Sequence, residues 1–239
     1  MSGDRADRLR SGKRLALIAL GLAFVLLPAL GQAENPDDRK GFFLAFSCQT
    51  LAPRGDQSDG LTLWHFDKAF FVPRLEAALD YGLALGFRRE GGLWELNVSV
   101  AKPPGTVGPT AHDVRLTRIE LNGWGFPWKH IFIQPYGLLG LSLAFMSVTD
   151  GSRLGGTTSD AAYTGFGLNA GGGLLVNIGR RLFVSGGVKY RWTWFFYVNG
   201  GGRGRDITTL TLGRNGADAF GRWLSAPSLG LSFSFGARL

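Results

Sequence analysis

Apolar and polar residues alternate with a period of two along most of this chain. In the segment 75–89, one set of alternate positions carries Leu79 and Leu83, and the other carries Asp80 and Gly82. A β-strand sends successive side chains to opposite faces, whereas the 3.6-residue period of a helix would mix the two sets. The alternation therefore predicts a strand with one apolar face and one face of small or charged residues.

The same alternation recurs to the end of the chain and predicts eight strands. They cover residues 41–50, 75–89, 92–102, 112–126, 130–147, 161–177, 181–198 and 226–239.

One of these strands, 112–126, contains a conflict of phase. Val114 and Leu116 share the parity of Arg118, Glu120 and Asn122, although the first pair is apolar and the other three residues are polar. A β-bulge near Thr117 would shift the phase and resolve the conflict. On this interpretation, Arg118, Glu120 and Asn122 face the interior.

The connections between the predicted strands alternate strictly between long and short, at about 24, 2, 9, 3, 13, 3 and 27 residues. Antiparallel outer-membrane barrels show this asymmetry, with short periplasmic turns and long external loops. The strands also reach the roughly 9–11 tilted residues that span a bilayer. A soluble barrel would have to bury the apolar set, and eight strands enclose little room for so many Trp, Phe and Leu side chains. We therefore predict an all-β fold, an eight-stranded antiparallel up-and-down transmembrane β-barrel.

Tryptophans support a membrane location. Six of the seven fall near predicted strand ends: Trp94, Trp124 and Trp128 at the periplasmic end, and Trp192, Trp194 and Trp223 at the outer end. Aromatic girdles occupy these two levels in membrane barrels.

The N-terminal segment predicts export. A stretch rich in Arg and Lys precedes the apolar run 15–30, which ends at Gly31-Gln32-Ala33. This order is typical of a secretory signal peptide, and we place cleavage after Ala33. Residues 1–33 are then the signal peptide, and residues 34–239 form one outer-membrane barrel domain. Export argues against nucleic-acid binding despite the net charge of +8.

Composition narrows the class further. The chain is 45% hydrophobic and only 18% charged, which argues against intrinsic disorder. Its single cysteine, Cys48, cannot form an internal disulfide and has no cluster of metal ligands nearby, so we expect no metal and no cofactor.

Two segments near the C-terminus resemble a known family. The pattern Ser228-x-Gly230-x-x-Phe233-x-Phe235 resembles the terminal-strand signal that the barrel assembly machinery reads, and the segment 186–192 resembles the penultimate strand of such barrels. The chain is thus similar to the small eight-stranded outer-membrane β-barrels, which include OmpX and the transmembrane domain of OmpA. The resemblance implies location in the cell outer membrane of a Gram-negative-type bacterium, with outer-membrane lipid and the assembly machinery as partners. It leaves the function open, because members act as adhesins, membrane staples, small pores or lipid-modifying enzymes.

Eight charged residues are expected to face the lumen: Glu76, Asp80, Arg88, Glu95, Arg118, Glu120, Lys189 and Arg191. Their mixed signs favour a network of ion pairs and hydrogen bonds that closes the barrel, because unpaired buried charges are costly. The alternative is a gated ion path.

The two longest loops, 50–74 and 199–225, carry the candidate surface sites. The first holds an apolar cluster that either folds back on the rim or forms a docking surface, and the tripeptide Arg54-Gly55-Asp56, a weak candidate for a host ligand. The second holds four candidate contacts to lipopolysaccharide phosphates, Arg203, Arg205, Arg214 and Arg222. The alternative for the second loop is a solvated segment.

Histidines give little support for catalysis. A lipid A deacylase would need a Ser nucleophile beside a His base, but His65, His112 and His130 lie in no His-x-Ser motif. We therefore expect no catalytic residues. The sequence predicts a non-catalytic surface barrel with an adhesion or membrane-integrity role exerted by its external loops. The alternatives are a lipid A-modifying hydrolase and a small-solute pore.

Overall fold

The computed structural model describes residues 40–65, 68–89, 91–128, 132–154, 156–179, 181–200, 203–207, 210–214, 217–220 and 223–239. The predicted signal peptide, residues 1–33, lies outside this part of the chain. None of the helices in the described part has the length and apolar character needed to cross a membrane.

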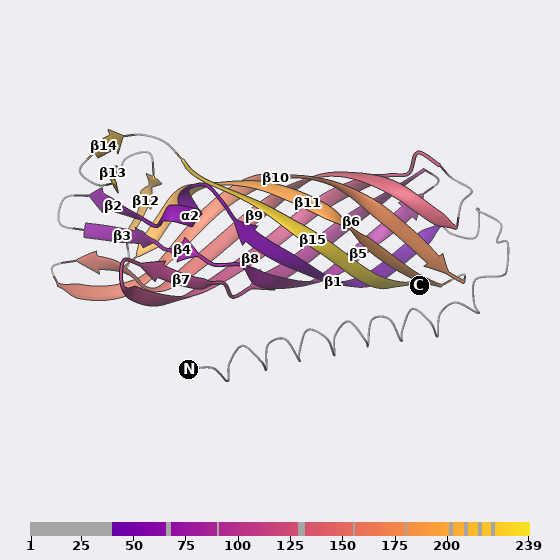
Figure 1. Ribbon diagram of the computed structural model, residues 1–239, viewed down its shortest axis with the longest axis horizontal. Helices are drawn as coiled ribbons and strands as arrows, with labels where there is room; N and C mark the ends of the chain where they lie inside the picture. Colours follow the sequence, from indigo (N-terminus) through magenta and orange to yellow (C-terminus); the bar gives the residue numbers. More distant parts are fainter. Residues whose placement is uncertain are drawn as a thin grey trace, which may run out of the picture.

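Eight long strands form a closed antiparallel ring (Figure 1). In ring order they are β1 (Gly41–Pro53), β5 (Ala78–Arg89), β6 (Gly92–Ala101), β8 (Thr110–Gly125), β9 (Ile133–Leu154), β10 (Thr157–Ile178), β11 (Leu182–Gly200) and β15 (Leu224–Arg238). Each strand pairs with the next, and β15 pairs with β1 to close the ring. The predicted eight-stranded up-and-down barrel is confirmed.

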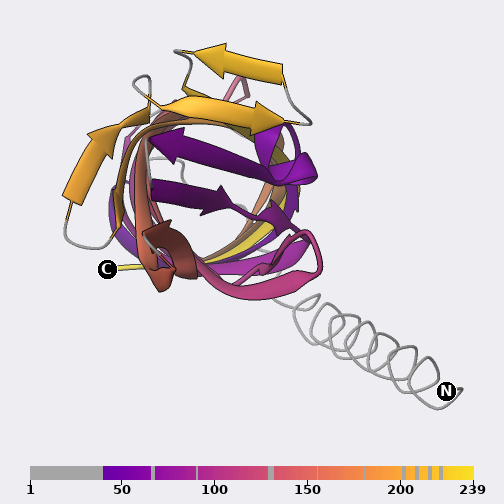
Figure 2. The same ribbon diagram turned by 90° about the vertical axis from the view of Figure 1, so that its left-hand side faces the viewer.

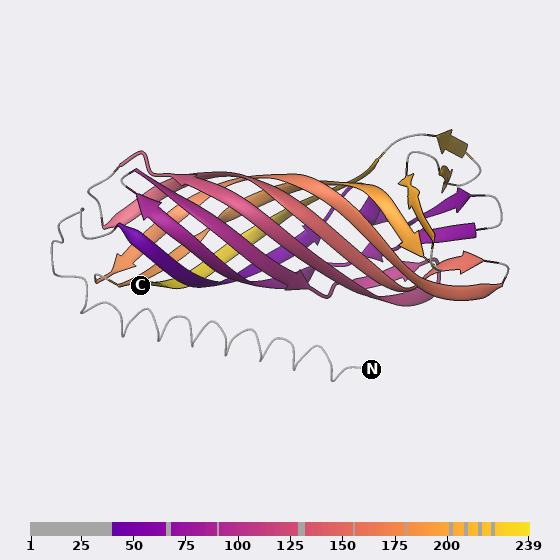
Figure 3. The same cartoon turned by 180° about the vertical axis from the view of Figure 1, so that it is seen from behind.

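The shorter elements gather at one end of the barrel (Figures 1 and 3). They are α2 (Asp56–Asp59), β2 (Leu61–His65), β3 (Lys68–Val72), β4 (Arg74–Leu75), β7 (Pro104–Val107), β12 (Arg203–Asp206), β13 (Thr211–Arg214) and β14 (Ala217–Phe220). Strand β13 pairs with β2, β2 with β3, and β3 with β9, so the first and last long loops share one sheet. We call this the loop end, and the opposite end, where the C-terminus lies, the turn end. In outer-membrane barrels the loop end faces the cell exterior.

The outward face of the ring is apolar. Large side chains exposed on it include Leu83 on β5, Trp94 on β6, Leu139 on β9 and Leu231 on β15, with relative exposures of 61–73%. These are the apolar members of the alternating sets, so the period of two in the sequence corresponds to the two sides of the barrel wall. A continuous apolar surface around the barrel is favourable in contact with lipid and unfavourable in contact with water.

The interior is filled in three layers along the barrel axis. An apolar cluster at the loop end combines wall residues with the β2–β3 hairpin, which lies across the opening of the ring in Figure 2. A polar layer built on Asp80, Glu120 and Arg191 follows. A second apolar cluster around Phe43, Trp124 and other rings closes the turn end.

The predicted bulge near Thr117 is wrong. The register of β8 with β6 and with β9 runs without a shift through this residue. Val114, Leu116, Arg118 and Glu120 all face the interior. The phase conflict reflects a change of layer, because Val114 and Leu116 belong to the apolar cluster at the loop end.

The tryptophan prediction needs one correction. Trp94, Trp128, Trp192 and Trp223 are exposed, as girdle residues should be. Trp124 is instead only 7% exposed and stacks on Tyr136 inside the barrel, with ring centroids 4.3 Å apart. Its position near a strand end is consistent with a girdle. However, the even-numbered residues of β8 face the interior, so Trp124 belongs to the turn-end cluster.

The seam between β1 and β15 requires a glycine at Gly230. A Cβ added there would collide with the backbone oxygen of Thr50. Beside it, the backbone N–H of Leu231 donates to Thr50 Oγ1 at 2.8 Å. The strands thus approach closely where the ring closes.

We expect Gly230→Ala to lower the free energy of unfolding by about 1–3 kcal/mol, the usual cost of overpacking. The measurement is urea unfolding of the barrel in detergent micelles, monitored by tryptophan fluorescence. Gly137→Ala is the control, because nothing lies within 4 Å of a Cβ at that position. Equal stability of the two variants would contradict a steric role for Gly230.

Candidate functional site

Ion pairs across the lumen form the centre of the polar layer. Arg118 Nη1 on β8 lies 3.1 Å from Asp80 Oδ2 on β5, and Arg191 Nη2 on β11 lies 3.6 Å from the same oxygen. Arg191 Nε also donates to Glu120 Oε1 at 2.6 Å, and Lys189 donates to the other oxygen of Glu120. Glu120 thus receives two cations from the opposite wall.

Amide side chains extend this network sideways. Asn122 Nδ2 donates to Glu95 Oε1 at 3.0 Å, and Asn169 Nδ2 donates to Asn122 Oδ1 at 3.1 Å. Gln49 accepts a hydrogen bond from Arg191. Three cations therefore face three carboxylates within the layer, which removes the main cost of burying them.

Seven of the eight charged residues expected in the lumen are buried inside the barrel. Arg88 does not join the central network. It donates to Gln134 and, at 3.2 Å, to Asn177 Oδ1, and its guanidinium lies 4.9 Å from the centre of the Phe126 ring. It therefore belongs to a separate polar group at the turn end, which Arg238 joins through Asn177.

Glu76 does not face the lumen. It is exposed between β4 and β5, and its backbone N–H donates to the Pro104 carbonyl at 2.9 Å. The alternation was extended through residues 76 and 77, but β4 ends at Leu75 and β5 begins at Ala78. Residues 76 and 77 lie outside both strands, so the alternation of β5 does not determine which way their side chains point.

Several interior polar residues escaped the sequence analysis. Gln49, Asn169, Gln134 and Asn177 are each buried and hydrogen-bonded inside the barrel. All four have the inward parity of their strands, so the alternation could have located them. Their uncharged amides did not mark them as members of a network of ion pairs.

The loop-end cluster is a plug built from the first long loop. Leu63 on β2 and Phe70 on β3 have no exposed surface, and they belong to the same cluster as Met146, Tyr163 and Phe195 on the wall. The hairpin is tied down by Tyr163 Oη, which donates to the Phe71 carbonyl at 2.8 Å. Of the two expectations for this loop, folding back describes Leu63 and Phe70, and these residues are not available for docking. Residues 66–67 lie outside the described part of the chain.

Lys68 contributes a polar tie to the same plug. Its side chain is 7% exposed, its ammonium group donates to the Gly200 carbonyl, and it lies 5.0 Å from the centre of the Phe70 ring. This contact joins β3 to the end of β11.

The Arg54-Gly55-Asp56 tripeptide is not presented as a free surface motif. Asp56 is 7% exposed, and its Oδ2 accepts the backbone N–H of Ser225 at 2.8 Å. The backbone N–H of Arg54 donates to the Pro227 carbonyl at 2.8 Å. The tripeptide thus fastens the first loop to the start of β15.

The four arginines proposed to contact lipopolysaccharide are only partly described. Arg203 and Arg205 lie on β12, which pairs with β11, and Arg214 lies on β13. The side chain of Arg205 is exposed. Arg222 lies outside the described residues.

His112, the histidine whose side chain the structure describes, contacts a backbone carbonyl. His112 Nδ1 lies 3.0 Å from the Thr149 carbonyl oxygen, and its ring centre lies 6.1 Å from that of Phe71. His65 lies on β2, and His130 falls outside the described residues. Among the described residues, no group of three or more His, Cys, Asp and Glu could hold a metal ion.

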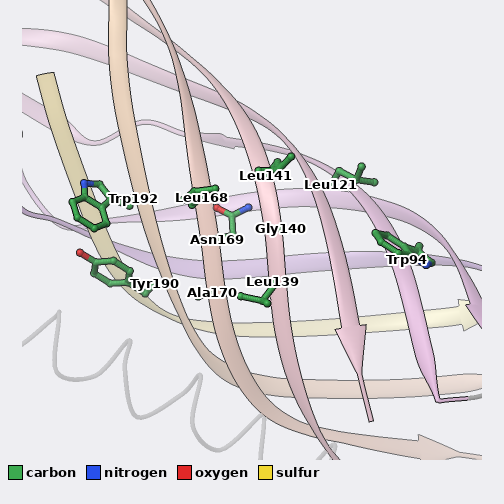
Figure 4. A pocket seen from close by; sticks show the side chains of 10 residues that line it. All are labelled: Trp94, Leu121, Leu139, Gly140, Leu141, Leu168, Asn169, Ala170, Tyr190 and Trp192. Carbon is green, nitrogen blue, oxygen red and sulfur yellow. The ribbon is translucent and has the colours of Figure 1, made fainter. Parts of the chain in front are cut away.

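The described part of the outer wall carries hollows of two kinds, apolar and polar. One, of about 560 Å³, lies within the apolar belt and is lined from β6, β8, β9, β10 and β11 by side chains that include Trp94, Leu139 and Trp192 (Figure 4). In a bilayer, acyl chains cover such a surface. The other, of about 550 Å³, lies toward the loop end and has polar walls that include Lys102, Arg115 and Ser147.

The terminal-strand residues divide between the two sides of the wall. Phe233 and Phe235 are exposed on the lipid-facing side, whereas Ser228 and Gly230 face inward. Phe233 pairs with Cys48 of β1 and Phe235 with Phe46, so the proposed assembly signal lies on the strand that closes the ring.

Comparison with solved structures places the fold. Neisserial surface protein A aligns over 83% of this chain and 97% of its own, with 14% identity and a TM-score of 0.51. The outer membrane protein OprG from Pseudomonas aeruginosa aligns over 84% of this chain and 97% of its own, with 13% identity and a TM-score of 0.49. This chain has the fold of a small outer-membrane β-barrel. No family model matches the sequence, and no curated protein matches it.

This fold agrees with the apolar belt and with the resemblance to OmpX and the OmpA transmembrane domain. The small outer-membrane barrel is therefore confirmed as the architecture of this protein. At 14% identity, the structural similarity establishes the fold and does not establish the activity.

Proposed function

We propose that this protein is a sealed outer-membrane barrel with a non-catalytic role in membrane integrity, exerted at its outer surface. Its partners are then outer-membrane lipid and lipopolysaccharide, with the barrel assembly machinery as its insertion partner. The observation that carries the proposal is the filled interior: the β2–β3 hairpin lies across the mouth (Figure 2), with Leu63 and Phe70 fully buried.

Below the plug, the balanced charges of the polar layer support the same interpretation. A conducting path for ions or solutes needs mobile water and one dominant sign of charge to be selective. Here Glu120 is engaged by Lys189 and Arg191, and Asp80 by Arg118 and Arg191. The turn-end cluster, with Phe43, Trp124 and Phe183, adds a third barrier.

Membrane integrity is favoured over adhesion by the structure of the loops. The first and last loops are joined by β2–β13 pairing into one compact cap, and Asp56 of the adhesion-type tripeptide is engaged within it. A rigid barrel with an arginine-bearing cap suits stitching to the phosphates of neighbouring lipopolysaccharide molecules. Adhesion through residues of this cap is the second form of the same surface role.

The sealed interior is tested by planar-bilayer recording of the purified full-length protein. We expect no stepwise conductance above that of a protein-free membrane, because three packed layers block the axis. Reproducible single-channel conductance steps would contradict the sealed barrel and would support the alternative of a small-solute pore.

The non-catalytic role is tested by mass spectrometry of lipid A from outer membranes with and without the protein. We expect identical acylation in the two samples, together with lower detergent resistance of the membrane that lacks the protein. Loss of an acyl chain only when the protein is present would establish a hydrolase. Unchanged detergent resistance would remove the integrity role.

A further inference from the structure

The polar hollow on the outer wall combines three features that a headgroup site requires. It is lined by Lys102 at the end of β6, by His112, Asp113 and Arg115 on β8, and by Ser147 and Thr149 on β9. Both cations, Lys102 and Arg115, are exposed. None of these residues belongs to the interior network or to the plug.

The two cations lie on facing segments of the wall. Ala101 of β6 pairs with Leu116, and Pro104 of β7 pairs with Asp113. Lys102 lies in the gap between β6 and β7, and continuing either register would set it opposite Arg115. Like charges at opposite positions of neighbouring strands repel each other and destabilise the sheet. Within the described part of the chain, neither cation has an ion-pair partner. An anion bound between them would remove the repulsion.

The hydroxyl groups and the carboxylate complete the polar set. Arg115 pairs with Ser147 on β9, which places a hydroxyl group beside the guanidinium on the outward face. Asp113, one outward position farther along β8, is exposed and can accept hydrogen bonds from the hydroxyl groups of a sugar. Thr149 on β9 lines the same hollow, and its carbonyl oxygen lies 3.0 Å from His112 Nδ1. The set suits a phosphorylated sugar better than a bare anion.

The hollow stands at the boundary of the apolar belt. Toward the turn end, the outward side chains of the same three strands are apolar: Val98 on β6, Ile119 on β8, and Leu143 and Phe145 on β9, all between 39% and 49% exposed. Toward the loop end they become Lys102, Arg115 and Ser147. Cations directly above an apolar wall match a lipid with a phosphate in its headgroup and acyl chains below.

We infer that this hollow binds the phosphorylated sugar headgroup of an outer-leaflet glycolipid, with Lys102 and Arg115 on the phosphate and the acyl chains along Val98, Ile119 and Phe145. The loop end faces the exterior in barrels of this architecture, so the lipid belongs to the outer leaflet. The site is distinct from Arg203, Arg205, Arg214 and Arg222 of the last loop. It also holds whether or not the barrel conducts, so a positive conductance test would leave it standing.

The test is a titration of the full-length barrel, in detergent micelles, with bisphosphorylated lipid A. We expect Lys102→Gln combined with Arg115→Gln to weaken binding at least about tenfold, the effect of losing charge-assisted hydrogen bonds to phosphate. The matched control is Arg89→Gln combined with Arg181→Gln, which removes the same charge from exposed positions at the turn end. The control is expected to bind like the original chain. An unboiled-gel mobility assay establishes that all variants are folded barrels.

Three results would overturn the inference. Equal weakening in the control would indicate attraction to net charge alone. Equal affinity for lipid A from which the phosphates have been removed would indicate binding by the acyl chains. Displacement of lipid A by inorganic phosphate at matching concentration would identify free phosphate as the ligand. Retention of binding by Arg115→Lys, with loss in Arg115→Gln, would support a charge contact at this position.

Discussion

Replacing Glu120 by Gln is expected to lower the free energy of unfolding by about 3–5 kcal/mol, the usual result of removing one partner from a buried ion pair. Glu120 has no exposed surface and accepts from both Lys189 and Arg191. Without its charge, the layer retains two carboxylates against three buried cations. The remaining excess charge cannot reach water, because apolar clusters lie on both sides of the layer.

The measurement is urea unfolding in lipid vesicles, followed by tryptophan fluorescence. Glu76→Gln is the matched control, because it removes the same carboxylate from an exposed position on the same barrel. Combining Glu120→Gln with Lys189→Gln restores the balance of charge and should recover part of the loss. If Glu120→Gln cost no more than Glu76→Gln, the layer would have to be hydrated, and the case for a sealed lumen would fail with it.

The barrel wall could be predicted because its two sides differ in polarity along most of each strand. Outward positions such as Leu139 meet lipid, and inward positions such as Asp80 meet the polar layer, so the period of two records the side directly. This contrast alone predicts the inward side of Lys189 and Arg191. The inward side of Glu120 was predicted together with a bulge that does not exist. Their partners could not be assigned, because pairing across the lumen depends on barrel closure and stagger.

Prediction failed where the interior is itself apolar. Val114 and Leu116 face inward like Arg118, yet their polarity matches the lipid side, and the sequence alone suggested a bulge that does not exist. Trp124 was misplaced for the same reason, because the turn-end cluster accepts aromatic rings. The alternation reports a difference between two environments and loses its meaning where both are apolar.

The cap formed by the first and last long loops could not be predicted from local sequence patterns. Pairing of β2 with β13 joins the first long loop to the last, and the Asp56 carboxylate accepts the backbone N–H of Ser225, 169 residues farther along the chain. Nothing in either loop alone encodes the other. The outer-wall hollow was missed because Lys102, Arg115 and Ser147 come from three strands and become neighbours only through the register.

Replacing Phe70 by Ala is expected to release the β2–β3 hairpin from the mouth of the barrel. The side chain has no exposed surface, and truncating a buried Phe costs about 3–5 kcal/mol. Much of that loss should fall on local opening of the hairpin, because the pairing of β3 with the wall is short. Lys68–Phe70 lie opposite Ser152–Leu154, and Lys68 and Phe71 add side-chain and backbone contacts.

Lys68 itself provides the readout. It is 7% exposed in the plug, so a lysine-specific protease can cleave after it only when the hairpin opens. Lys102, the other described lysine near the loop end, precedes Pro103, and such bonds resist cleavage. We expect Phe70→Ala to raise the cleavage rate at Lys68 by at least about a hundredfold, as a 3 kcal/mol change in an opening equilibrium requires.

Phe42→Ala is the control, because it removes the same side chain from a position that is 58% exposed on the lipid-facing wall, where acyl chains fill the gap. Its cleavage rate at Lys68 should equal that of the original chain. Rapid cleavage of the original chain would mean that the hairpin spends much of its time outside the mouth. The seal would then rest on the charged layer around Glu120 and on the turn-end cluster. Conductance measured in the Phe70→Ala variant would show whether these two layers close the barrel without the plug.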